Sequence, residues 1–201
     1  MFPDILRARL QGIIDLSAAQ VSELQAHYQL LLRWNRTLNL TRVQCLEEAV
    51  VRHYGESLFL ASHLPAGPIR IADIGSGAGF PGLPVAVARP DCQVTLIESH
   101  QRKAVFLREA SRSLPNVRVL ALRAEAVTET FDHAVSRAVS YADLEKPLKR
   151  LAANVDLLTG VDAPPESLPV EWQPAIPLPW GKHHVLRIGR LKSKQEPEYS
   201  A

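Results

Sequence analysis

The sequence predicts an α/β fold in which a doubly wound, mainly parallel sheet follows a helical extension. Two observations predict it. From Ile69 onward, short apolar segments alternate with amphipathic ones, which is typical of strand–helix–strand units. Before Pro65, apolar residues instead recur every three or four positions, which is the period of a helix. At 201 residues the chain suits one core with an extension, predicted at 66–201 and 1–65.

The extension carries a clear start signal for a helix. Ser17 and Gln20 have the Ser-x-x-Gln spacing of a capping box, and apolar residues follow on one face as far as Leu32. A second helical pattern covers 46–60. The segment Pro65–Pro68 is the predicted linker into the core, because prolines end helices.

The core is predicted to begin with a strand that leads into a glycine-rich turn. Prolines are dense between Pro164 and Pro179, so that stretch is expected to be loop or extended edge structure, and the polar tail after Lys192 is expected to fray. The predicted strands are 69–73, 94–97, 117–120, 133–136, 155–158 and 184–188, and the predicted helices are 83–88, 102–114 and 141–153.

The composition is that of an ordinary soluble globular protein, with 46% hydrophobic and 22% charged residues. No apolar run approaches the ~18 residues that span a bilayer, and the N-terminus does not have the pattern of a secretory signal. Cys45 and Cys92 lie far apart and lack a metal-type spacing, which indicates a reducing compartment. We therefore expect a cytoplasmic protein without a membrane segment or a metal site.

The most specific motif is the glycine-rich turn in residues 70–84, RIADIGSGAGFPGLP. Glycine adopts positive φ without steric cost and has no Cβ to hold a ligand away from the backbone. A strand that leads through such a turn into a helix forms the nucleotide-binding corner of an open α/β sheet. A tight turn without a ligand is the weaker interpretation, because four glycines occur within eight residues. They are Gly75, Gly77, Gly79 and Gly82.

Local residues favour one nucleotide over another. The spacing Gly77-x-Gly79-x-x-Gly82 matches the NAD/FAD fingerprint. However, a carboxylate at Asp73 would repel a pyrophosphate and suits a cationic ligand group. Pro81 and Pro84 also lack the backbone N–H groups that a pyrophosphate needs at a helix start. S-adenosylmethionine, which has an amino group and a sulfonium but no phosphate, fits better. The order Asp-x-Gly-x-Gly-x-Gly resembles motif I of the Rossmann-like class I methyltransferases.

Further candidate residues follow the later strands. Glu98 ends the second predicted strand, where a carboxylate can accept the ribose hydroxyls of S-adenosylmethionine or of NAD. Backbone groups of Ala124 and Glu125 can hold the adenine edge, although a plain surface loop explains them equally well. Arg137, at the end of the fourth strand, can bind a methionine carboxylate or a substrate phosphate.

No residue is predicted to act as a catalytic acid or base. The chain lacks the Asn/Asp-Pro-Pro-aromatic element of enzymes that methylate exocyclic amines, and neither Cys45 nor Cys92 lies where a nucleophile is needed. An acceptor that needs no deprotonation explains this pattern. Guanine N7 has a free lone pair at neutral pH, so its methylation needs only placement in line with the methyl donor.

These segments together resemble the bacterial 16S ribosomal RNA guanine-N7 methyltransferase family, RsmG or glucose-inhibited division protein B. The resembling segments are WNRTLNLT, VRHYGES, IADIGSGAGFPGLPVAVARP, VTLIESHQRKAVFLREA, LRAE and FDHAVSRAV, between 34 and 139. The resemblance implies guanine 527 of 16S rRNA, in the small ribosomal subunit, as substrate. The segment Leu158-Thr159-Gly160 departs from the family's usual Leu-Lys-Gly, because Thr159 replaces the lysine. Contacts to S-adenosylmethionine are implied at Gly75, Phe80, Ala124, Glu125 and Arg137.

Arginine outnumbers lysine 17 to 6, and arginine suits bidentate phosphate contacts. We expect the RNA surface on the extension and the helix 102–114, with Lys182–Lys194 as the alternative; solvated helix faces would explain the same clusters. The open alternatives for function are a non-catalytic RNA-binding ribosome-assembly factor, an NAD-type oxidoreductase and a small-molecule methyltransferase. We expect a monomer. The candidate RNA-binding residues are Arg33, Arg36, Arg102, Arg108 and Arg112.

Overall fold

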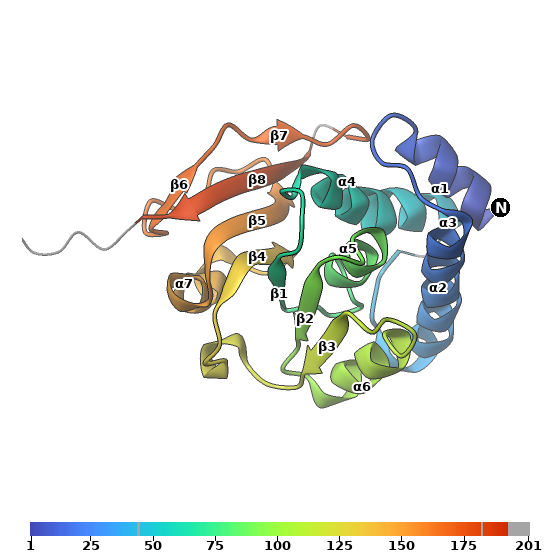
Figure 1. The fold of residues 1–201 in the computed structure, drawn as a ribbon, viewed down its shortest axis with the longest axis horizontal. Coiled ribbons are helices and arrows are strands. Elements are labelled where there is room, and N and C mark those ends of the chain that lie inside the picture. The colour runs from blue at the N-terminus through green and yellow to red at the C-terminus, as the bar shows by residue number, and fades with distance from the viewer. Residues whose placement is uncertain (44, 182, 193–201) are drawn as a thin grey trace, which may run out of the picture.

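A computed structural model describes residues 1–43, 45–181 and 183–192. Within them, eight strands form one sheet with the order β3-β2-β1-β4-β5-β8-β6, and β7 pairs with β8 beside this path (Figure 1). Strands β1 to β5 are parallel, and β8 runs antiparallel to β5. The strands are β1 Arg70–Ile74, β2 Gln93–Ile97, β3 Val117–Leu120, β4 Phe131–Arg137, β5 Ala152–Gly160, β6 Val170–Trp172, β7 Ile176–Pro177 and β8 His184–Leu191.

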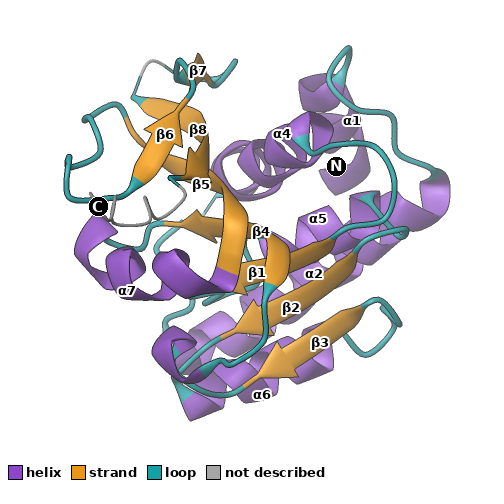
Figure 2. Cartoon of the chain, turned by 60° about the vertical axis from the view of Figure 1, so that its left-hand side comes forward, coloured by secondary structure: helices purple, strands orange, loops and turns teal. Residues whose placement is uncertain are grey.

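The helices cover the two faces of the sheet unequally. Helices α1 to α6 gather on one side and α7 lies on the other (Figures 1 and 2). The larger apolar core lies under the first group, and a smaller one lies between α7 and the sheet. The helices are α1 Phe2–Leu10, α2 Ala18–Leu38, α3 Leu46–Ala49, the π-helix η1 Val50–Gly55, α4 Glu56–His63, α5 Gly82–Ala88, α6 Gln101–Ala110, the 3₁₀-helix η2 Ala124–Ala126 and α7 Tyr141–Leu151.

The predicted helical extension packs directly on the core. The capping box is present: the Gln20 N–H donates to Ser17 Oγ at 3.2 Å, and the Ser17 N–H donates to Gln20 Oε1 at 2.9 Å. Leu24 of α2 and Phe106 of α6 are fully buried in the same apolar cluster. The extension therefore shares its core with the sheet.

A buried histidine joins the extension to the glycine turn. Burial lowers the pKa of His27 to about 4, so its ring is neutral near pH 7. The ring then donates from Nε2 to the Ala78 carbonyl at 3.0 Å and accepts the Tyr54 hydroxyl at Nδ1 at 2.9 Å. These bonds connect α2, η1 and the turn after β1.

Several predicted boundaries shift for non-local reasons. Strand β5 is longer than the predicted 155–158 because β8 pairs with it from Asn154 to Gly160. Helix α6 ends at Ala110 and not at the predicted residue 114, because the residues after Ala110 form turns. The proline-rich stretch forms the short edge strands β6 and β7. The tail after Lys192 lies outside the described residues.

Candidate active site

The glycine turn after β1 adopts the backbone that the sequence requires. Gly75 has φ +71° and Gly77 has φ +57°, both in the region that favours glycine. A Cβ on Gly75 would lie 2.6 Å from Val139 Cγ2. Gly75 is therefore required both by its dihedral and by the close approach of the loop after β4.

The carboxyl group of Asp73 caps helix α5 from below the turn. Asp73 is fully buried, and its Oδ2 accepts the Gly82 N–H at 3.0 Å. Gly82 follows Pro81, so this carboxylate takes the first available amide donor of the helix. A pyrophosphate would need that donor. The Asp73 side chain faces α5 and does not face a ligand pocket, which differs from the expected contact with a cationic ligand group.

Asp73 gives a pH-dependent prediction. Burial raises the pKa of its carboxyl to about 7. Between about pH 4 and about pH 7 the folded chain keeps a proton that the unfolded chain releases, so this group lowers the free energy of unfolding as pH rises. Asp73→Asn should remove this pH-dependent decrease in the free energy of unfolding. The decrease is about 4 kcal/mol, at ~1.36 kcal/mol per pKa unit.

Urea unfolding of both proteins near pH 4 and near pH 8 measures this difference. His27 and His53, whose pKa values burial lowers to about 4 and about 3, are present in both proteins and cancel in the comparison. The same pH dependence in the variant and the wild type would contradict the prediction.

A pocket of about 250 Å³ lies over the carboxyl ends of β1 and β2, and we call it the glycine-turn pocket. Four of the predicted cofactor residues line it: Gly75, Glu98, Ala124 and Glu125. Its other lining residues are Ile74, Ile97, Ser99, Leu122, Arg123, Val139 and Asp143. The fold thus brings together four predicted residues that follow three different strands, β1, β2 and β3.

Glu98 organises one wall of this pocket. Its Oε2 accepts the Gly77 N–H at 2.9 Å, and its Oε1 accepts the His100 N–H at 2.7 Å. Glu98 is buried, so two amide donors hold the carboxylate in place. Each oxygen keeps a further lone pair that can accept a hydroxyl of a bound ribose.

Phe80 occupies a different place from the one its implied role suggests. Its side chain is buried between His53, with ring centroids 4.7 Å apart, and Tyr54, at 5.1 Å. Phe80, Gly77 and Gly79 are not among the lining residues of the glycine-turn pocket. The Phe80 ring instead packs the turn against the extension.

Arg137 lines a second pocket of about 370 Å³, which we call the β4–β5 pocket. Arg137 Nε donates to Glu56 Oε2 at 2.9 Å, and Glu56 Oε1 lies 2.8 Å from His184 Nδ1. Glu56 is only 6% exposed, so its charge is held by these two partners. Val139 lines both pockets and separates them.

Sequence reasoning missed Glu56 and His184. They are 128 residues apart in the chain, and no local spacing relates them. Glu56 does lie in the VRHYGES segment, and His184 begins the predicted last strand. Only the pairing of β8 with β5 brings them together.

The candidate RNA-binding arginines lie on α2, on α6 and just after α6. All five are exposed, and none forms an ion pair with another described residue. The two helices are in contact, because Trp34 Nε1 donates to Glu109 Oε2 at 3.0 Å. Of the alternative stretch, Lys182 and Lys194 lie outside the described residues. The five are Arg33, Arg36, Arg102, Arg108 and Arg112.

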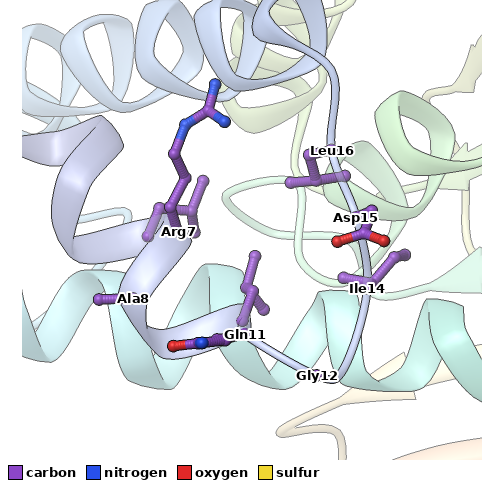
Figure 3. A pocket seen from close by; sticks show the side chains of 9 residues that line it. Arg7, Ala8, Gln11, Gly12, Ile14, Asp15 and Leu16 are labelled. Carbon is purple, nitrogen blue, oxygen red and sulfur yellow. The ribbon is translucent and has the colours of Figure 1, made fainter.

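Another hollow, of about 380 Å³, lies between α1 and the loop that follows it (Figure 3). Arg7 and Asp15 are its charged lining residues. No predicted cofactor residue lines it. In the part of the chain that the structure describes, no cluster of three metal-binding side chains occurs, and no helix is long and apolar enough to cross a membrane.

A comparison with protein families identifies the family of this chain. Residues 20–154 match the GidB family, described as rRNA small subunit methyltransferase G. The chain belongs to this family. The matched range includes most of α2, the glycine turn, every lining residue of the glycine-turn pocket and Arg137.

Several relatives bear the GidB-family description "Ribosomal RNA small subunit methyltransferase G". That of Xylella fastidiosa (strain 9a5c) is 47% identical over 131 residues, which are 63% of this chain and 61% of the relative. That of Chromobacterium violaceum is 45% identical over 134 residues, which are 65% of this chain and 64% of the relative. The matched part thus spans less than two thirds of each relative.

Solved structures show the same fold. A SAM-dependent methyltransferase from Aquifex aeolicus has a TM-score of 0.57 at 16% identity and covers 72% of this chain and 93% of its own. A putative RNA methyltransferase from Pyrococcus horikoshii has a TM-score of 0.56 at 10% identity and covers 85% and 98%. The GidB-family chain therefore has the predicted class I methyltransferase fold.

Proposed function

We propose that this protein transfers a methyl group from S-adenosylmethionine to N7 of a guanine in 16S rRNA, with nucleotide 527 as the target. The observation that carries the proposal is the glycine-turn pocket, where Gly75, Glu98 and the Ala124–Glu125 loop meet. The family description of a small-subunit rRNA methyltransferase supports the substrate class.

The two pockets suggest how the cofactor is divided between them. At about 250 Å³ the glycine-turn pocket is smaller than the ~300–1,000 Å³ of most ligand sites, so we assign to it only the adenosine part. Arg137, across Val139 in the β4–β5 pocket, is then placed for the methionine carboxylate. When bound, the cofactor supplies a methyl group on an electrophilic sulfonium.

The protein's own residues hold and orient the reactants. Glu56, the one carboxylate that lines the β4–β5 pocket, is engaged by Arg137 and His184 and is not free to act as a base. Guanine N7 needs no base, so positioning is sufficient for transfer. The Asp73 carboxyl already accepts the first amide N–H of α5, which a pyrophosphate would need. This contact argues against the NAD-type oxidoreductase.

We predict that the protein binds S-adenosylmethionine and S-adenosylhomocysteine but not NAD. The reason is that Asp73 already accepts the N–H that a pyrophosphate would use, while Glu98 can still accept ribose hydroxyls. Calorimetric titration measures both affinities. Micromolar NAD binding without any response to S-adenosylhomocysteine would overturn the proposal.

The substrate is tested with small ribosomal subunits. We expect the protein, which we propose to be monomeric, to transfer labelled methyl groups to one guanine of 16S rRNA, and mass mapping of the RNA identifies the nucleotide. Binding to the subunit without any methyl transfer would favour the non-catalytic assembly factor. Labelling of a small molecule alone would remove rRNA as the substrate.

We further propose that the arginines of α2 and α6 bind RNA phosphates. Removing Arg33 and Arg36 together should flatten the salt dependence of RNA binding, because each lost phosphate contact changes the slope by about 0.7 for single strands. Filter binding across salt concentrations measures the slope, and cofactor affinity should not change.

A matched control is the double variant Arg7→Ala, Arg9→Ala. These arginines are also exposed, lie in the last turn of helix α1 and form no ion pair with another described residue. The control should keep the full salt slope. An unchanged slope after loss of Arg33 and Arg36 would place the RNA on another surface.

A further inference from the structure

A third pocket continues the β4–β5 pocket toward β8. It measures about 170 Å³ and is lined by Val51, Arg52, Glu56, Leu178, Trp180, Gly181, His183 and His184. Arg52, Glu56 and His184 line both pockets. The two pockets are therefore adjacent, and we call them together the β8 groove; Val139 lies between this groove and the glycine-turn pocket.

The charge of the β8 groove suits an anionic ligand. Arg52 and Arg137 line it, and Arg52 is 45% exposed beside Glu48 at 2.9 Å. The one carboxylate among the lining residues is Glu56, which is buried and already bound to Arg137 and His184. Arg52 thus carries its charge at the edge of the groove, paired with the partly exposed Glu48, while Arg137 is bound to the buried Glu56.

Trp180 gives the groove an aromatic wall. A Cβ on Gly55 would lie 3.2 Å from Cη2 and Cζ3 of Trp180, so the absence of a side chain at Gly55 lets the indole lie against η1. Phe59 contacts the same indole edge-on, with centroids 6.2 Å apart and planes at 77°. These contacts fix the orientation of the half-buried indole, which also lines the groove.

We propose that the β8 groove binds single-stranded RNA next to the target guanine, with one base stacked on Trp180 and a phosphate at Arg52. Proteins hold single strands without reading their sequence by combining basic side chains with aromatic platforms, and Arg52 and Trp180 supply one of each here. The groove also includes the β4–β5 pocket, where Arg137 is proposed to hold the methionine part of the cofactor. This inference rests on the proposed function for the identity of the RNA.

The groove is separate from the arginine face of α2 and α6. In the sheet order, β3 beside α6 and β8 lie toward opposite ends (Figure 1). The glycine-turn pocket lies between them, over β1 and β2. One strand of RNA can therefore contact both surfaces while the target base enters from the groove side.

The test uses a labelled single-stranded oligoribonucleotide without cofactor, followed by fluorescence anisotropy. Trp180→Leu should weaken binding about tenfold, which lies within the range of about fivefold to more than a hundredfold that stacking of one base contributes. Trp180→Phe should retain most of the affinity, since it keeps an aromatic face. Arg52→Ala should reduce the salt slope by about 0.7.

Lys149→Ala is the matched control for Arg52→Ala. Lys149 also forms an i,i+4 ion pair, with Glu145 at 2.7 Å, and its exposed fraction of 48% is close to the 45% of Arg52. It lies on α7 and lines none of the three pockets. This control should bind the oligoribonucleotide like the wild type.

A second readout does not depend on affinity. A base stacked on Trp180 should quench tryptophan fluorescence, with Trp34 and Trp172 as background, and Trp180→Phe should abolish the quench. Circular dichroism shows whether Trp180→Leu folds; if it does not, Arg52→Ala and the quench decide.

The outcomes separate this inference from the proposed function. Wild-type protein that does not bind the oligoribonucleotide, or groove variants with unchanged affinity, salt slope and quench, would overturn the β8 groove even if methyl transfer to the small subunit occurs. Binding that depends on Trp180 and Arg52, without any methyl transfer, would support the groove and overturn the proposed function.

Discussion

Replacing Arg137 with alanine should lower the rate of methyl transfer by at least about tenfold, a loss of roughly 1.4 kcal/mol in transition-state stabilisation. Arg137 is only 16% exposed and stands at the end of β4, beside the wall between the two pockets. Its Nε is held by Glu56, which leaves the outer nitrogens of the guanidinium for the cofactor carboxylate. Steady-state kinetics with small ribosomal subunits measures the effect.

Loss of the arginine also leaves a buried carboxylate with one partner fewer, which can destabilise the fold by about 3–5 kcal/mol. The double variant Glu56→Gln, Arg137→Ala is the control for this, because it removes the buried charge as well. If the double variant regains stability but not activity, Arg137 acts on the reactants. Unchanged turnover in the single variant would place Arg137 outside the site.

Replacing Gly75 with valine should abolish measurable cofactor binding. The residue has φ +71°, and a Cβ there would lie 2.6 Å from Val139 Cγ2, so a branched side chain meets the pocket wall directly. Gly77→Val should also block binding, through its φ of +57° and its hydrogen bond to Glu98. Calorimetric titration with S-adenosylhomocysteine measures both.

Gly12→Val is the control for backbone strain alone. Gly12 has φ +75°, but nothing lies within 4 Å of a Cβ built on it, and it lies in the loop after α1 (Figure 3). Valine there should cost about 1–2 kcal/mol of stability and leave cofactor affinity unchanged. A Gly75→Val variant that folds and binds S-adenosylhomocysteine normally would show that the glycine turn is not the site.

The sequence predicts the features that depend on neighbouring residues. Strand β3 lies at the predicted 117–120, and the Ser17–Gln20 capping box forms as expected. The positive φ values of Gly75 and Gly77 follow from the motif, because few other residues tolerate that backbone. Each of these features is determined by local steric or hydrogen-bonding rules.

The features that the sequence does not predict depend on distant segments. The predicted helix over 46–60 contains a π-helix at 50–55, against which Trp180 packs from the far end of the chain. The direction of the Asp73 carboxyl and the Phe80 ring depends on which helix packs nearby, and spacing alone does not specify this. The Glu56–His184 pair requires the β5–β8 register.

The way the extension packs has a consequence for how this protein can be divided. Phe80 is seated among side chains of the first 65 residues, and the Ala78 carbonyl is bound by His27. A fragment that starts at residue 66 would expose those aromatic surfaces and release the turn that carries Gly75 and Gly77. The N-terminal helices thus hold the glycine turn in place, so we expect a functional fragment to include them.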